Sequence, residues 1–175
     1  TLRYEKTRAF TRDVYDLALQ AVKDSEESWW VKDSALRIIG HAPADWVQPH
    51  IDTLLPYLQH EDWWLQNATL VALCSVVADE RCYKQVLPPI GELIRTNQRS
   101  ALTLGLMGSI REKIKSGSDE VHKLAAETLK GSFTRYAGVK TARGGQDISS
   151  TFDSHMEYIA ASLADVPGGL DLLYE

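Results

Sequence analysis

Two tryptophan pairs in register constrain the fold of this chain more than any other feature of its sequence. Residues 29–39 (WWVKDSALRII) align with residues 63–73 (WWLQNATLVAL) at an offset of 34. Residues 47–55 (VQPHIDTLL) align with residues 86–94 (VLPPIGELI) at an offset of 39. Self-similarity at a period of this length indicates stacked copies of one supersecondary unit. The five extra residues in the second offset predict a longer polar loop around residues 78–82.

The aligned segments have the apolar periodicity of helices. In the first copy the apolar positions follow i, i+4, i+7, i+8 and i+11 spacing, which forms one stripe: Val47, Ile51, Leu54, Leu55 and Leu58. The proline at the third position of each copy suits a first helical turn, where its missing N–H costs nothing. The sequence therefore predicts helices over residues 12–23, 29–40, 47–58, 63–77 and 86–95.

Two helices in each unit, with one narrow apolar stripe apiece, must stack on neighbouring units to bury those stripes. The order of a Pro-bearing first helix, the Asp-containing turn at residues 59–62 and a second helix with small apolar residues resembles the HEAT and armadillo repeat family. The resemblance covers about residues 12–94. It implies an all-α fold, a right-handed α–α superhelix or solenoid of about three to four helix pairs. Solenoids of this kind serve as scaffolds more often than as catalysts.

Regularity decays beyond residue 95. We expect one domain over residues 1–175, with regular repeats over about 12–95 and irregular helices and a long loop over 96–175, as a fragment of a longer protein. The later elements are predicted as helices around residues 102–114, 119–129 and 156–163 and a loop over 131–150. Since neither end resembles a capping repeat, we also expect self-association through uncapped ends.

Charge and composition restrict the partners. The chain has 19 Lys and Arg against 24 Asp and Glu, a net charge of −5, which argues against a nucleic-acid partner because phosphate binding favours a basic excess. No apolar stretch approaches the ~20 residues of a membrane helix, so no membrane partner is expected. Cys74 and Cys82 are too few for a disulfide scaffold, and we expect two ordinary thiols.

The tryptophan pairs have two interpretations. Adjacent helical residues point about 100° apart, so one ring of each pair can pack between repeats while the other faces outward. Alternatively, the rings form a ladder on one surface that binds a peptide, a sugar face or a base. The residues concerned are Trp29, Trp30, Trp63 and Trp64.

Trp29 and Asp33 support an alternative reading as an enzyme. Their i, i+4 spacing places both on one helix face. The pair is similar to the aromatic-plus-Asp arrangement of the bacterial alkylpurine DNA glycosylases, which are built of HEAT-like repeats. That resemblance implies that Asp33 would stabilise positive charge developing on the sugar. It would also require a basic groove supplied by residues such as Arg95, Arg99, Arg111, Lys113 and Lys115.

No other motif indicates chemistry. The five histidines lack metal-ligand spacing, so exposed or capping roles are expected, and neither a metal nor a cofactor is predicted. A basic stretch offers a second contact surface, through Arg95, Arg99, Arg135, Lys140 and Arg143. The sequence therefore favours a noncatalytic interaction or scaffold module that contacts a protein partner or other domains of its own chain. The alternatives are the glycosylase-like enzyme and a glycan-binding surface on the Trp pairs.

Overall fold

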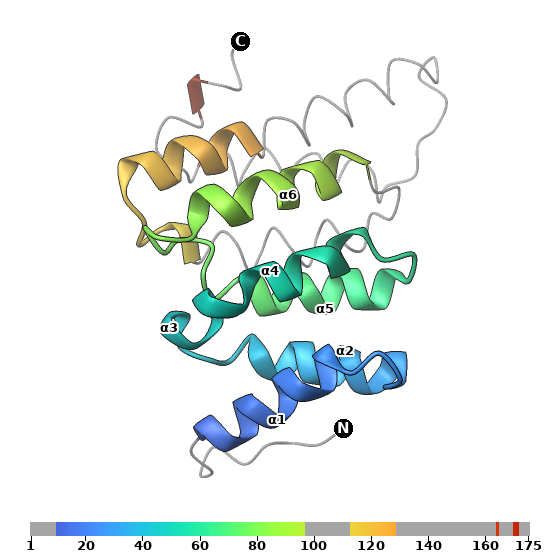
Figure 1. Cartoon of the computed structure of the whole chain (residues 1–175). Coiled ribbons are helices and arrows are strands. Elements are labelled where there is room, and N and C mark those ends of the chain that lie inside the picture. The colour runs from blue at the N-terminus through green and yellow to red at the C-terminus, as the bar shows by residue number, and fades with distance from the viewer. Residues whose placement is uncertain (1–9, 97–112, 129–163, 165–169, 172–175) are drawn as a thin grey trace, which may run out of the picture.

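The computed structural model describes residues 10–96 and 113–128, together with residues 164, 170 and 171. This part of the chain is helical and contains no strand (Figure 1). The α-helices are α1 (Arg12–Lys23), α2 (Trp29–Ile39), α3 (Ala44–Val47), α4 (Ile51–Leu54), α5 (Trp63–Leu73) and α6 (Tyr83–Thr96). Two 3₁₀ segments, η1 (Gln48–His50) and η2 (Leu55–Gln59), continue α3 and α4, and residues 119–128 form a further helix. The all-α class is thus confirmed.

The helix bounds follow the sequence repeat. Helix α5 has the same length as α2 and starts 34 residues later, and α6 starts 39 residues after α3. The residues that precede α2 and α5, Ser28 and Asp62, are both N-cap residue types. The two offsets found in the sequence therefore also separate the starts of these helices.

The predicted helix over residues 47–58 is wrong in its start and in its continuity. Helical structure begins at Ala44, directly after Pro43, and passes into 3₁₀ turns at Pro49 and Pro56. A proline inside a helix has no N–H for the carbonyl four residues earlier, so the chain tightens into 3₁₀ turns there. Pro49 consequently lies in the first turn of η1 and not in the first turn of the helical segment that begins at Ala44.

Two other predicted bounds also differ. Helix α6 begins at Tyr83 rather than residue 86, which places Pro88 and Pro89 inside the helix. Helix α5 ends at Leu73 rather than residue 77, because the chain changes to tighter turns: the Val76 N–H donates to the Leu73 carbonyl at 3.0 Å. The longer connection predicted before α6 is present and spans residues 74–82.

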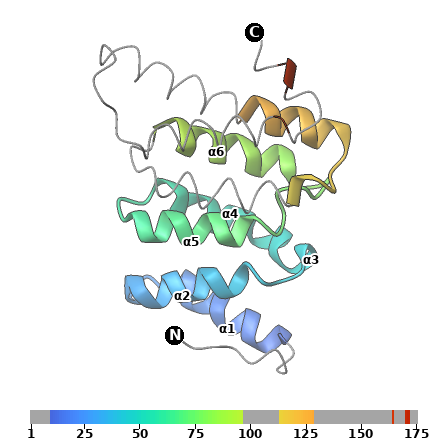
Figure 2. The same ribbon diagram turned by 180° about the vertical axis from the view of Figure 1, so that it is seen from behind.

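The helices pack in successive layers. Helix α1 packs on α2, α2 on α5, α5 on η2, and η2 on α6. Figures 1 and 2 show the resulting layers from α1 up to α6, with the turns at residues 24–28 and 60–62 on one side and the connections 40–43 and 74–82 on the other. The intra-pair turns therefore share one edge of the molecule.

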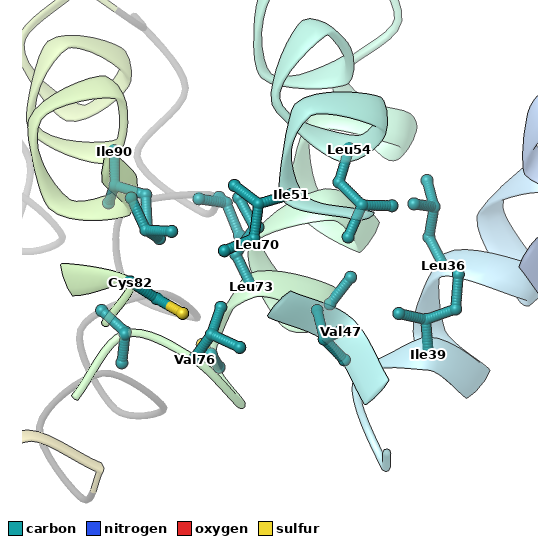
Figure 3. Close-up of a cluster of buried hydrophobic side chains, with 14 of the residues drawn as sticks. Leu36, Ile39, Val47, Ile51, Leu54, Leu70, Leu73, Val76, Cys82 and Ile90 are labelled. Carbon is teal, nitrogen blue, oxygen red and sulfur yellow. The ribbon is translucent and has the colours of Figure 1, made fainter. Parts of the chain in front are cut away.

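A continuous apolar core runs through these layers. Leu36 of α2, Ile51 of α4, Leu70 of α5 and Ile90 of α6 are all essentially inaccessible to solvent (Figure 3). Full burial of a Leu or Ile side chain contributes about 1.5–3 kcal/mol. The core thus joins successive helix pairs, and no pair buries its stripe alone.

The structure tests only some of the predictions made for the residues after α6. Residues 119–128 are helical, as predicted, and this helix lies against α6, where Gly91 approaches Thr128. The loop at residues 131–150 and the last helix at 156–163 lie outside the described residues. Among the helices that the structure describes, none combines the length and the apolar character needed to cross a bilayer.

Candidate functional site

Trp29 and Trp30 begin α2, and both rings are exposed. Their exposed fractions are 51% and 61%, so neither acts as a wedge between helix layers. The interpretation that one ring of each pair packs into the core is therefore wrong for this pair. Ser34 donates its hydroxyl to the Trp30 carbonyl at 3.0 Å, one turn further along the same helix.

Trp63 and Trp64 begin α5 and behave as that interpretation expects. Trp63 packs against the core, while Trp64 is 43% exposed. The two rings stack on each other with centroids 3.8 Å apart and planes 30° from parallel. Because Trp63 is held by the core, it fixes the position of the outer ring.

The turns before these helices are acidic and internally hydrogen-bonded. Asp62 caps α5 by accepting the Trp64 N–H at 2.9 Å, and the His60 ring accepts the Asp62 N–H at 3.0 Å. In the preceding turn, Asp24 accepts the Glu26 N–H at 2.9 Å, and Glu27 accepts the N–H of the next residue. Both turns therefore hold carboxylates within a few residues of the tryptophans that follow them.

Asp33, the candidate catalytic carboxylate, is paired within its own helix. The Arg37 Nε donates to one carboxylate oxygen at 2.9 Å and its terminal nitrogen to the other at 3.1 Å. Both oxygens of Asp33 thus accept bonds from one guanidinium. Trp29 lies one turn earlier and is half exposed.

The basic groove that the enzyme reading requires lies mostly outside the described residues. Lys113 and Lys115 are described, and both are exposed. The other candidates belong to the part of the chain that the structure does not describe, or to the end of α6 where only the backbone is described: Arg95, Arg99, Arg111, Arg135, Lys140 and Arg143. The predicted basic surface therefore remains a prediction.

An aromatic cluster beside the first turn of α1 has no counterpart among the predicted site residues. The Trp46 ring contacts Phe10 at 5.9 Å and Tyr15 at 5.7 Å between centroids, and the Arg12 guanidinium lies 5.2 Å from the Trp46 ring. Tyr15 is fully buried and donates to the Trp46 carbonyl at 2.6 Å. Burial, opposed by the nearby Arg12 charge, raises the pKa of Tyr15 to about 12. This cluster holds α1 against α3.

The histidines only partly match their predicted roles. His41 is exposed and His60 supports a helix cap, but His122 is buried. One ring nitrogen of His122 lies 2.9 Å from the Ile114 carbonyl, and the other has no hydrogen-bond partner. The expectation of an exposed or capping role is therefore wrong for His122, which belongs to the core around the 119–128 helix.

The two cysteines are buried free thiols, as predicted. Burial raises the pKa of Cys74 and that of Cys82 to about 11. A thiol in such surroundings is protonated at neutral pH and unreactive. Within the described segments, no group of three or more His, Cys, Asp or Glu residues is arranged to hold a metal ion.

Comparison of the chain with protein-family models, with curated proteins and with solved structures gave no match. The function is therefore inferred from the chain's own geometry.

Proposed function

We propose that this chain is a noncatalytic protein-interaction module, built as a HEAT-like α-solenoid within a longer protein. The observation that carries the proposal is the exposure of Trp29, Trp30 and Trp64 on the edge formed by the two acidic turns. Exposed aromatic rings gathered in one region are typical of binding surfaces, where Trp is among the residues that contribute most energy.

The packing order supports the solenoid part of the proposal. Helix α2 packs on its equivalent, α5, and η2 packs on α6, which is the equivalent of the 44–59 segment. In a right-handed superhelix of three to four helix pairs, like helices of successive repeats lie side by side in this manner. The helix at residues 119–128 extends the stack beyond α6, where Thr128 lies against Gly91.

The glycosylase-like alternative has less support. A carboxylate that stabilises a developing cation needs an oxygen directed at the substrate, whereas both oxygens of Asp33 accept bonds from Arg37. We therefore treat Trp29 as a binding residue and Asp33 as part of a helix-stabilising ion pair.

A peptide-library selection tests the proposal. The wild-type chain is expected to enrich a common peptide motif, and a triple variant, Trp29→Ser with Trp30→Ser and Trp64→Ser, is expected to lose it. The control is Leu17→Ser, since Leu17 is 69% exposed on α1 but lies outside the edge. Helical circular dichroism must be unchanged in both variants. Enrichment that survives the triple substitution, or no enrichment at all, would contradict the proposal.

A further inference from the structure

We propose that the edge formed by the two acidic turns and the tryptophans after them binds an extended cationic peptide segment. Arg or Lys side chains three residues apart in that segment would rest on Trp30 and Trp64. The inference rests on the proposed function and adds the chemistry of the partner. We define the tryptophan edge as the turns at residues 24–28 and 60–62 with the tryptophans that follow them. Figure 1 shows these turns on the same side of the stack.

The charge of the edge indicates a cationic partner. The two turns carry five carboxylates and no Lys or Arg: Asp24, Glu26, Glu27, Glu61 and Asp62. Lys32, on the first turn of α2, is directed toward the Tyr57 ring, with its ammonium 6.0 Å from the ring centroid. The edge therefore keeps a negative potential that attracts a cation and repels an anion.

The carboxylates have different roles. Asp24, Glu27 and Asp62 accept backbone N–H groups and hold the turns in place. Glu26 and Glu61 are exposed, and Glu26 accepts the Ser25 hydroxyl at 3.4 Å, so they are the carboxylates best placed to meet a partner's charge. Because Glu26 and Glu61 hold no cap, their substitution separates binding from folding.

The exposed rings add selectivity for Arg and Lys. A guanidinium or ammonium group within about 6 Å of an indole face is attracted by the ring quadrupole. Arg12 already makes such contacts in this chain, at 5.0 Å from Tyr15 and 5.2 Å from Trp46. At the tryptophan edge Trp30 is exposed, and Trp64 remains 43% exposed although its ring stacks on Trp63, so both can contact a second molecule.

The packing of α2 on α5 sets the expected spacing of the cations. Trp30 and Trp64 occupy equivalent positions on α2 and α5, which pack directly on each other. Packed helices lie about 8–10 Å apart. A polyproline II segment repeats its side-chain direction every three residues and rises about 9 Å over that interval. Cations at i and i+3 of such a segment would therefore match the expected spacing of the two helices that carry Trp30 and Trp64.

Calorimetric titration with three peptides tests this inference. The probe is Ac-PPRPPRPP-NH2, the charge control is Ac-PPQPPQPP-NH2, and the spacing control is Ac-PPPRRPPP-NH2. We expect the probe to bind, the Gln peptide to show no binding, and the adjacent-Arg peptide to bind several-fold more weakly. Raising the salt concentration should weaken binding of the probe, because exposed charges are screened.

Two matched variants locate the contact. Trp30→Ala should weaken binding of the probe roughly tenfold or more, and the double variant Glu26→Gln with Glu61→Gln roughly threefold to tenfold. Glu80→Gln with Glu120→Gln removes the same charge from exposed residues away from this edge, and it should leave binding unchanged. Leu17→Ala is the corresponding control for loss of an exposed apolar side chain.

Three results would overturn the inference. These are equal binding of the probe by the Trp30→Ala variant, equal binding of the Gln peptide, and salt-independent binding of a neutral oligosaccharide such as chitotetraose at the same rings. If the library selects neutral peptides whose capture depends on the tryptophans, the proposed function stands and this inference fails. If the library selects nothing, both fail.

Discussion

At the scale of single residues, Tyr15 links two helices through a buried side chain. Its ring is fully buried and its hydroxyl donates to the Trp46 carbonyl at 2.6 Å. We predict that Tyr15→Phe lowers the free energy of unfolding by about 1–2 kcal/mol, because that carbonyl loses its buried donor. Urea denaturation followed by circular dichroism measures the loss. Tyr57→Phe removes a similar 2.6 Å bond, to the Val22 carbonyl, from a half-buried ring and should cost less.

The same residue predicts the alkaline behaviour. The pKa of Tyr15 is raised from 10.0 to about 12 by burial, so between those values the unfolded chain releases this proton and the folded chain keeps it. Unfolding is then favoured as pH rises, and the contribution is lost from about pH 10 upward. The stability difference between wild type and Tyr15→Phe should therefore shrink as pH rises from 10 to about 12. A constant difference would show that Tyr15 ionises equally easily in both states.

Cys74 and Cys82 give a second prediction at this scale. Both thiols are buried and have pKa values of about 11, so neither forms appreciable thiolate at pH 8. Ellman's reagent should leave both unmodified in the folded chain at pH 8 and label two thiols per chain in 6 M guanidinium chloride. Rapid labelling of one thiol without denaturant would contradict the burial of that residue.

At the scale of elements, Gly40 permits the close packing of α2 on α5. A Cβ at this position would lie 2.7 Å from the Val71 carbonyl oxygen, and backbone cannot move aside cheaply. Its φ of −61° is ordinary, so the requirement is for space and not for an unusual backbone conformation. We predict that Gly40→Ala destabilises the chain by about 1–3 kcal/mol, the usual cost of overpacking, in urea denaturation.

Gly91→Ala is the matched control for that substitution. Its added Cβ would meet the Thr128 Cγ2 at 3.0 Å, a contact that a shift of a few tenths of an ångström relieves, and Ala gains up to about 1 kcal/mol of helix propensity over Gly. Gly91→Ala should therefore be close to neutral. Equal destabilisation by the two substitutions would mean that the α2–α5 contact has no special steric requirement.

The helices were the most predictable level of this structure. The repeated pattern is local, so α1, α2 and the 119–128 helix follow from periodicity within one or two residues. The start of the 44–59 segment was missed, because the apolar stripe begins at Val47 while the helical turn begins after Pro43. The spacing of apolar residues locates the buried positions of a helix, but it does not locate the residue at which the helix starts.

The candidate site was less predictable than the helices. Trp29 and Trp63 occupy equivalent positions, yet Trp29 is half exposed and Trp63 packs against the core. The spacing in the sequence cannot predict which of the two rings is buried, because burial depends on the side chains that the neighbouring helices place against each ring. The i, i+4 spacing of Asp33 and Arg37 is by itself sufficient to predict a helix-stabilising ion pair between them.

At the scale of the whole molecule, the way in which unfolding spreads from one helix to the next distinguishes a solenoid from a domain with a single core. The extensive contacts described above join helices that follow one another through the layers, from α1 to α6. In a solenoid, stability is the sum of unit stabilities and nearest-neighbour interfaces, so damage to one unit stays partly local. In a domain with one indivisible core, the same damage spreads to every helix.

Two matched truncations separate these cases. Leu36 of α2 and Leu87 of α6 are both fully buried, and either Leu→Ala change should cost about 2–5 kcal/mol. By hydrogen exchange with mass spectrometry, Leu36→Ala should accelerate exchange most in α1 and α2, and Leu87→Ala most in α6 and residues 119–128. Helix α5, which lies between the two sites in the stack, should respond to both substitutions. Equal acceleration in every helix by either variant would identify one global unit and contradict the solenoid proposal.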